Sequence, residues 1–524
     1  MPVRIDDDGA PASAAGSSPA YANYVLGVLV LVYVLNFVDR QILSILAEDV
    51  KRDLGLSDAD LGFLYGTAFG VFYALFGIPL GRLADSWRRV TLMSGGLALW
   101  SAMTALSGFA RGGAELAAAR IGVGIGEATA SPCAYSLLSD YFPREKRATA
   151  LAIYSSGLYL GGGLSLFVGG AVVERWNAAY PGGGPLGLAG WQAAFLAVGI
   201  PGLLLALLVA TLREPLRGQS DGLLSPPVAR PFASFLQELV TVLPPLTLIG
   251  AARRGAGALA INIALALMTA TLAVAMIRLT GDVPQWSAIG IGVYAVFSWA
   301  SALRRRDPPT FALIWGTPTF LCVAIGYGLI AFVAYSVSFW SAPFALRELG
   351  GSPATAGLLI GGAGAAGGFI GVVLGGRFAD RLRRTDPAGR IKVALFGAVA
   401  PVVPMLVAFN ATDIGLFYAL QLPMVALSSS ALGASAATTQ DLVLPRMRGT
   451  ATATFFLATT LVGLALGPYL AGRVSAWSGD LGTGVLSLLA VIPISIGCLL
   501  YAHRTLPAAE ASVADRARAA GEPV

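Results

Sequence analysis

The chain has 524 residues, of which 56% are apolar and only 12% are charged. A soluble domain carries about 25% charged residues, so this chain has too few of them to cover a water-facing surface. The formal net charge of +6 comes from arginines in short loops, a pattern that reports membrane topology and gives no sign of a nucleic-acid partner. The composition therefore predicts a protein with many membrane-spanning helices.

The first part of the chain reads as a tail followed by a bundle of helices. Residues 1–20 are rich in Ala, Ser, Pro and Gly and predict a disordered tail without a cleavable signal peptide. Residues 21–216 contain six apolar segments, each long enough to cross about 30 Å of hydrocarbon as a helix. We place these segments near 24–46, 59–80, 90–110, 113–138, 148–172 and 190–212.

Residues 217–309 form a central region with a different character. Residues 231–243 put their apolar side chains on one helical face, so we expect either a helix along the membrane interface or a linker helix docked on the bundle. Two further apolar segments, near 255–278 and 285–303, carry no charge deep in the apolar run. We expect them to form an inserted hairpin outside the core that contributes nothing to a central cavity.

A second set of six apolar segments predicts a second bundle over residues 310–505, followed by a cytoplasmic tail over residues 506–524. These segments lie near 318–346, 354–376, 389–409, 413–438, 450–472 and 482–503, which brings the expected number of spans to fourteen. The arginine-rich loops all fall on one side under this assignment. Because basic loops stay in the cytoplasm, both termini are expected to be cytoplasmic.

The two halves share repeated sequences. Gly81 to Arg89 recurs as Gly376 to Arg384, an offset of 295 residues, and Asp140 to Ala150 recurs as Asp441 to Ala451, an offset of 301 residues. Two six-helix halves alone would give roughly 190–200 residues, so the excess of about 100 corresponds to the central region. A loop motif repeated between apolar spans is typical of a transporter built from two homologous bundles.

The repeated loop resembles the loop between the second and third helices of the major facilitator superfamily. That resemblance implies a charge clamp that controls gating at the cytoplasmic side, with Asp85 closing the second span near Arg88 and Arg448. The gating residues expected from the motif are Gly81, Asp85, Arg88, Arg89, Asp380, Arg381, Arg384 and Arg448.

Four ionisable residues lie deep within predicted spans of the first half: Asp39 and Arg40 in the first span, Arg120 and Glu127 in the fourth. Each costs at least ~2.5–3.5 kcal/mol in the membrane, which favours a functional role. Since Asp39 and Arg40 are sequence neighbours and point in different directions, we expect pairing across helices, Asp39 or Glu127 with Arg40 or Arg120. A static buried ion pair is the alternative.

The matching spans of the second half carry no charge and are rich in aromatic residues. We expect Tyr335, Phe339 and Trp340 to form an apolar wall opposite the charged wall, a cavity that suits an amphipathic ligand. Helix packing or lipid contact is the alternative for these aromatic residues. The only histidine, His503, lies at the end of the last helix, so carboxylates must carry any transported proton.

Two strings resemble the Spinster-like transporters within that superfamily, namely Asn36-Phe37-Val38-Asp39-Arg40 and Arg120 to Ala128. The resemblance implies proton-coupled export of sphingoid or lysophospholipid-type lipids. It also implies that Asp39, Arg40, Arg120 and Glu127 are the proton-coupling and head-group residues. The central region departs from the twelve-span pattern of that family.

We therefore expect an all-α membrane protein with the major facilitator fold, a monomeric secondary transporter of a bacterial inner membrane. Its expected partners are protons, membrane lipids and an amphipathic small molecule or lipid, with no metal, cofactor or enzymatic activity. The alternatives within transport are a drug or organic-anion exporter and an uptake carrier for aromatic or sugar acids. The alternatives outside it are a passive lipid scramblase and a receptor that does not transport.

Overall fold

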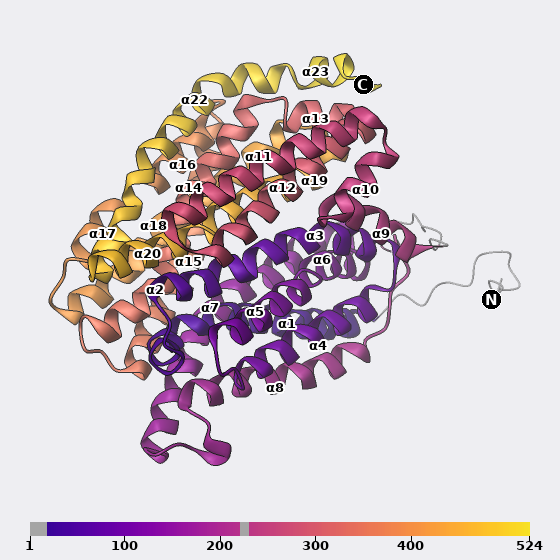
Figure 1. The fold of residues 1–524 in the computed structure, drawn as a ribbon. Helices are drawn as coiled ribbons and strands as arrows, with labels where there is room; N and C mark the ends of the chain where they lie inside the picture. Colours follow the sequence, from indigo (N-terminus) through magenta and orange to yellow (C-terminus); the bar gives the residue numbers. More distant parts are fainter. Residues whose placement is uncertain (1–17, 219, 221–229, 524) are drawn as a thin grey trace, which may run out of the picture.

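The computed structural model describes residues 18–218, 220 and 230–523. Within these residues every regular element is a helix, and the helices form two bundles with a central group of helices beside them (Figure 1). The tail expected over residues 1–20 lies outside the described residues up to position 17. Ser18 caps the first helix, because its hydroxyl oxygen accepts a hydrogen bond from the Tyr21 amide.

The first bundle follows the predicted order of six spans. Its helices are α1 (Pro19–Leu54), α2 (Asp58–Gly62) and α3 (Ala68–Ser86), α4 (Arg89–Ser107), α5 (Gly113–Glu127) and α6 (Ala130–Tyr141), α7 (Arg144–Ala179) and α8 (Gly190–Ala210). A π-helical turn, Phe63–Thr67, joins α2 to α3. The fourth span was expected to be one helix but is interrupted after Glu127, because Pro132 has no amide to donate to the carbonyl of Ala128.

The second bundle repeats this plan with more interruptions. Its helices are α14 (Pro318–Arg347), α15 (Pro353–Arg383), α16 (Gly389–Val399) and α17 (Val402–Ala408), α18 (Ile414–Asp441), α19 (Arg448–Ala458) and α20 (Gly467–Ser478), α21 (Leu481–Ser487) and α22 (Ile492–Ala511). A π-helical turn, Thr459–Leu464, follows α19. The expected tail 506–524 is largely helical, because α22 continues into it and α23 (Val513–Ala519) packs on the central helices.

The central helices are α9 (Pro231–Val242), α10 (Leu246–Arg253), α11 (Ala256–Thr280), α12 (Val283–Arg306) and α13 (Pro308–Ile314). Helix α9 is docked on α3, with the Phe232 ring 5.0 Å from the Trp87 ring, while Phe232 and Leu236 stay about half exposed. Helices α11 and α12 form the expected hairpin. Most of α11 faces away from the protein, whereas α12 packs against both bundles.

In the part of the chain that the structure describes, thirteen helices are long and apolar enough to cross a membrane, and the α9–α10 pair, bent by 101°, makes up to fourteen if counted as one span. The α5–α6 segment is not among the thirteen because it is broken into two short helices, yet it packs against α3 and α4 inside the first bundle. Together with the thirteen, it accounts for the fourteen spans expected from the sequence.

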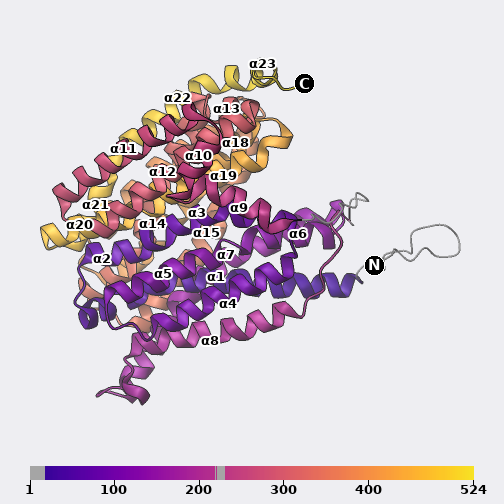
Figure 2. The same ribbon diagram turned by 45° about the vertical axis from the view of Figure 1, so that its right-hand side comes forward.

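The beginning of α1 and the helix α23 lie toward the same end of the molecule in both views (Figures 1 and 2). We call this end the terminal face and the opposite end the distal face. The bundles approach each other closely through glycines toward the distal face. A Cβ atom on Gly66 would lie 2.3 Å from the Leu464 carbonyl oxygen, and one on Gly170 would lie 2.2 Å from that of Pro353. Larger side chains at these positions would hold the bundles apart.

Candidate functional site

The four ionisable residues predicted inside the spans come together between α1 and α5. Asp39, Arg120 and Glu127 are at most 1% exposed, and Arg40 is 9% exposed. We call this group the charge cluster. Its position within the first bundle means that both charged strings of the sequence fold onto the same internal surface.

One cross-helix ion pair forms in the charge cluster. Arg40 Nη2 donates to Glu127 Oε2 at 2.8 Å, which is one of the pairings expected from the sequence. The Arg40 guanidinium also lies over three aromatic rings, with its Cζ 4.7 Å from Phe37, 4.6 Å from Phe69 and 5.0 Å from Tyr73. Aromatic faces attract a cation, so this cage compensates part of the cost of burying Arg40.

Arg120 and Asp39 do not form the second pair. Arg120 Nη1 donates instead to the main-chain oxygen of Asp39 at 3.0 Å. Neither carboxylate oxygen of Asp39 has a hydrogen-bond partner among the described residues, although Trp100 and Thr104 of α4 lie next to it. A buried carboxylate without hydrogen bonds is costly as an anion, which distinguishes Asp39 from Glu127.

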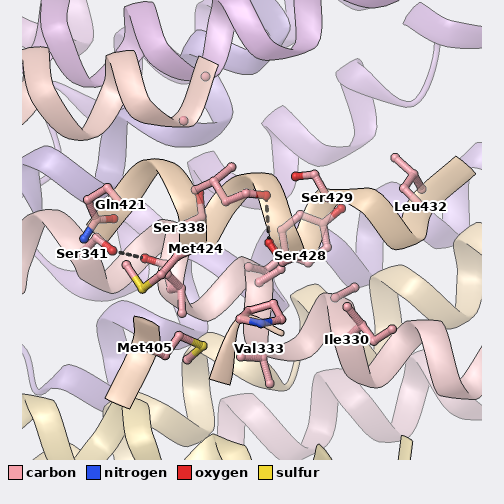
Figure 3. Close-up of a pocket in the computed structure, with 18 of the residues that line it drawn as sticks. Ile330, Val333, Ser338, Ser341, Met405, Gln421, Met424, Ser428, Ser429 and Leu432 are labelled. Carbon is pink, nitrogen blue, oxygen red and sulfur yellow. Dashed lines mark hydrogen bonds between the residues drawn. The ribbon is translucent and has the colours of Figure 1, made fainter. Parts of the chain in front are cut away.

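A cavity of about 240 Å³ lies on the second-bundle side of α1. Its wall is mostly apolar, with the serines and Gln421 shown in Figure 3 placed on α14 and α18. The residues that line it include Phe37, Gln41, Tyr159, Tyr327, Tyr335, Ser338, Ser341, Met405, Gln421, Met424, Ser428 and Ser429. No residue from 250–305 is among the described lining residues, as expected for the inserted hairpin.

The charge cluster does not line this cavity, contrary to the expectation of a charged wall. Phe37 and Gln41, which flank Asp39 and Arg40 in α1, form that part of the wall instead. Because successive helical residues point in different directions, the charges lie behind the lining residues and face α5.

The expected aromatic wall is only partly present. Tyr335 lines the cavity, but Phe339 and Trp340 are fully buried outside it. The Phe339 ring stacks on Tyr65 at 4.3 Å, and Trp340 Nε1 donates to the main-chain oxygen of Pro468 at 2.9 Å. These two residues therefore hold helices together in this conformation, which was the alternative considered for them.

Gln421 was not among the predicted site residues. Its side chain lines the cavity, is 1% exposed, and has an amide nitrogen with no hydrogen-bond partner among the described residues. A polar residue in an otherwise apolar stretch of α18 is the sequence signal that could have identified it. Such an unpaired donor can bind an oxygen atom of a ligand.

At the distal face, Arg347 joins the two bundles. Its guanidinium donates to the Glu48 carboxylate at 2.6 Å and to the Asp58 carboxylate at 2.7 Å, and Ser475 also donates to Asp58 at 2.7 Å. Among the described ion pairs, these of Arg347 are the two that connect the first bundle with the second. We call this group the distal lock, because it fastens the bundles on that side.

At the terminal face, the two repeated motifs make equivalent ion pairs inside their own bundles. Arg89 pairs with Asp140 in the first bundle, and Arg390 pairs with Asp441 in the second, each across 51 residues of chain. Arg89 is fully buried and also contacts Glu214 at 2.8 Å. The sequence motif pointed to Arg384 as the counterpart of Arg89, whereas the structure gives that place to Arg390.

The other predicted gating residues form no bridge between the bundles in this conformation. Asp85, Arg88, Arg381, Arg384 and Arg448 are exposed at the terminal face, and no described ion pair includes them. Asp380 pairs with Arg390 at 3.1 Å within its own bundle. Gly81 is not in a close contact between helices, because a Cβ atom added to it would meet no atom within 4 Å. Their role in gating stays a prediction.

No group of three or more His, Cys, Asp or Glu side chains in the described part of the chain could hold a metal ion. The features of the site that the structure does show are a buried ion pair, an unpaired carboxylate and the adjacent apolar cavity.

Comparison with known proteins agrees with the fold. The model of the Major Facilitator Superfamily matches residues 29–346. An "MFS-type efflux pump" of Mycolicibacterium smegmatis is 28% identical over 492 residues, and the match covers 92% of each chain. "Protein spinster homolog 1" of Homo sapiens is 25% identical over 482 residues, and the match covers 88% of this chain and 74% of that protein. A crystal structure of a bacterial homolog of the human lysosomal transporter Spinster, in an inward-facing and unoccupied conformation, has a TM-score of 0.66 at 25% identity and covers 96% of this chain and 98% of that one. The chain belongs to the major facilitator superfamily of membrane transporters, and Spinster-type proteins are among its relatives.

Proposed function

We propose that this protein is a proton-coupled secondary transporter that exports an amphipathic small molecule or lipid by alternating access. The observation that carries the proposal is the position of the apolar cavity directly beside the charge cluster, separated from it by Phe37 and Gln41 of α1. Breaking or forming the Arg40–Glu127 ion pair can therefore shift the position of α1, and with it the cavity wall that Phe37 and Gln41 form.

Alternating access is supported by the asymmetry between the two faces. The distal lock joins the bundles at one face, while the predicted gating residues at the other face make no described bridge between them. Such an arrangement fits a state open toward the terminal face. The abundance of arginine at that face favours a cytoplasmic location for it, and the bacterial relatives favour the inner membrane.

Proton coupling is assigned to Asp39. Its carboxylate has no hydrogen-bond partner among the described residues, whereas Glu127 is paired with Arg40. A carboxylate that is costly to bury as an anion gains from binding a proton, and it can release the proton when the surroundings change. Asp39 is therefore the proton carrier of the proposal, and Arg40–Glu127 is the pair that responds to it.

The substrate class follows from the cavity wall. Aromatic, Met and small residues would take the apolar part of a ligand, while Gln421, Ser338 and Ser428 would bind polar atoms at its head. A lysophospholipid or sphingoid molecule has this character. An apolar drug is the second candidate, favoured by the efflux pump of M. smegmatis that is similar over 92% of the chain.

Purified protein in liposomes tests the proposal with a fluorescent lysophospholipid and a lipophilic drug, each with and without a pH gradient. We expect gradient-dependent movement of one of them by the wild type and none by Asp39→Asn. Asp413→Asn is the matched control, because Asp413 caps α18 and asparagine caps a helix equally well. Movement that ignores the gradient would indicate a scramblase, and full proton-driven movement by Asp39→Asn would refute the coupling residue.

A further inference from the structure

Five arginines meet at the terminal end of the inserted hairpin. They come from the end of α10 and from the end of α12, which both contact α11, and their identities are Arg253, Arg254, Arg304, Arg305 and Arg306. Glu238 of α9 balances one of these charges, since it pairs with Arg306 at 2.7 Å. Arg253, Arg254, Arg304 and Arg305 form no ion pair with any described residue, so the group carries a large uncompensated positive charge.

The geometry concentrates this charge at the beginning of α11. Arg305 Nη1 donates to the main-chain oxygen of Arg254 at 2.7 Å, and its Nη2 lies 3.6 Å from the position of a Cβ atom on Gly257. The Arg305 guanidinium thus lies beside the first turn of α11. Nε and Nη2 of Arg254 are shielded from solvent and have no hydrogen-bond partner among the described residues. An acceptor bound beside this side chain could satisfy donors that the described residues leave unpaired.

Two further observations indicate that the missing acceptor is an anion. Helix α11 has 25 residues and begins after Gly255 without a side-chain cap, so the positive end of its dipole adds to the arginines. Burial is the main cause that lowers the pKa of Arg254, and repulsion from the neighbouring Arg305 and Arg306 lowers it further; a bound anion would relieve that repulsion.

The surroundings favour a lipid as the source of the anion. Beyond its first turns, α11 exposes apolar side chains away from the protein, among them Ile261 at 48% and Leu267 at 64% exposure. In a membrane these residues contact acyl chains, so a head group at the arginines would continue into tails along α11. A soluble anion has no acyl chain to contact this apolar face of α11, so the face would not strengthen its binding.

We propose that the arginines at the junction of α10, α11 and α12 bind the phosphate of an anionic membrane lipid, with Arg254 and Arg305 as its principal donors. This site is separate from the central cavity, since none of its residues lines that cavity. The inference therefore does not depend on which molecule the protein transports. The inserted hairpin would thus bind a lipid at a site that lies outside the twelve-helix core.

The test uses the full-length protein in detergent and measures its Tm against phosphatidylglycerol, phosphatidylcholine of equal chain length, and inorganic phosphate. We expect a saturable rise in Tm with phosphatidylglycerol and none with the other two. In Arg254→Gln/Arg305→Gln the apparent Kd should increase at least about tenfold, because two charge-assisted hydrogen-bond donors are lost. Arg175→Gln/Arg504→Gln removes two exposed arginines elsewhere and should bind as the wild type does.

Two readouts keep the inference falsifiable if the double variant folds poorly or if the lipid also enters the central cavity. A photoreactive phosphatidylglycerol, labelled at its head group, should crosslink wild-type protein within residues 253–259 or 301–306. Gln421→Ala, which alters only the central cavity, should leave the yield of crosslinks at these residues unchanged. Crosslinks distributed equally elsewhere, equal effects of inorganic phosphate, or equal affinity of the double variant would each overturn the proposal.

Discussion

Gln285 of the inserted helix α12 binds Thr67, which lies in the π-helical turn of the second span. The Thr67 hydroxyl donates toward Gln285 Oε1 at 2.7 Å, and the main-chain oxygen of Ala465 lies 2.5 Å from the same hydroxyl. Thr67 belongs to the first bundle and Ala465 to the second, so one fully buried contact joins both bundles and the hairpin. The hairpin therefore does more than lie beside the core in lipid.

Replacing this amide should loosen the distal side. Gln285→Leu should lower the stability by about 1–3 kcal/mol, because it removes buried hydrogen bonds, and should increase the separation of the bundles at the distal face. Spin labels at Ala178→Cys and Trp477→Cys, both exposed, measure that separation in a background without the three free cysteines. Gln440→Leu, which affects a bond within the second bundle, should leave the distance unchanged.

The charge cluster predicts unequal effects on stability for its two carboxylates. Glu127→Gln leaves Arg40 buried without its partner and should cost about 3–5 kcal/mol, while Asp39→Asn should change the stability little, because no described hydrogen bond is lost. Thermal unfolding in detergent measures both. The double variant Arg40→Gln/Glu127→Gln should recover much of the loss, and a Glu127→Gln variant as stable as the wild type would contradict the paired state.

The distal lock should set the balance between conformations. Arg347→Gln removes two ion pairs between the bundles, so the population open at the distal face should increase and the same spin-label distance should lengthen. Arg52→Gln is the matched control, because Arg52 is exposed and pairs with Asp49 and Asp53 of its own helix. An unchanged distance in Arg347→Gln would show that packing alone keeps the face closed.

Asp85 should affect gating and not affinity. It is exposed and takes part in no described ion pair, so Asp85→Asn should break none in this conformation, whereas in the alternate one it should remove the pairing with Arg448 that the motif predicts. Equilibrium binding of a transported ligand should be unchanged while its exchange across liposome membranes slows. Loss of binding would place Asp85 in the ligand site instead.

The contact between Asp307 and Arg446 predicts a dependence of stability on pH. Hydrogen bonds from Arg446 lower the pKa of Asp307 to about 2. Because this pKa lies below the unfolded value of about 3.9, the stabilisation is complete above that value and is lost as the pH falls toward 2. Since Arg446 is nearly half exposed, the contribution should be only about 1 kcal/mol. Asp307→Asn should lower the Tm at pH 7, and its difference from the wild type should shrink below pH 4.

The sequence by itself determined the spans, the two repeated halves and the residues of the charge cluster. These features follow from local chemistry, since a long apolar segment must form a helix in lipid and a charge within it is costly wherever it points. The insertion of two central spans was also predictable, because the repeated motifs are about 100 residues further apart than two six-helix halves alone would place them. The equivalence of Arg89 and Arg390 was also present in the sequence, in the 301-residue offset of Asp140 and Asp441.

Only the tertiary structure decided which of these residues meet. Arg40 and Arg120 carry the same charge, yet one pairs with Glu127 and the other binds a main-chain oxygen, because the rotation of α5 against α1 selects between them. Phe339 and Trp340 are as aromatic as Tyr335, but their side of α14 faces helices and not the cavity. Composition and spacing give the period of a helix, whereas its rotation and its neighbours depend on packing across the whole bundle.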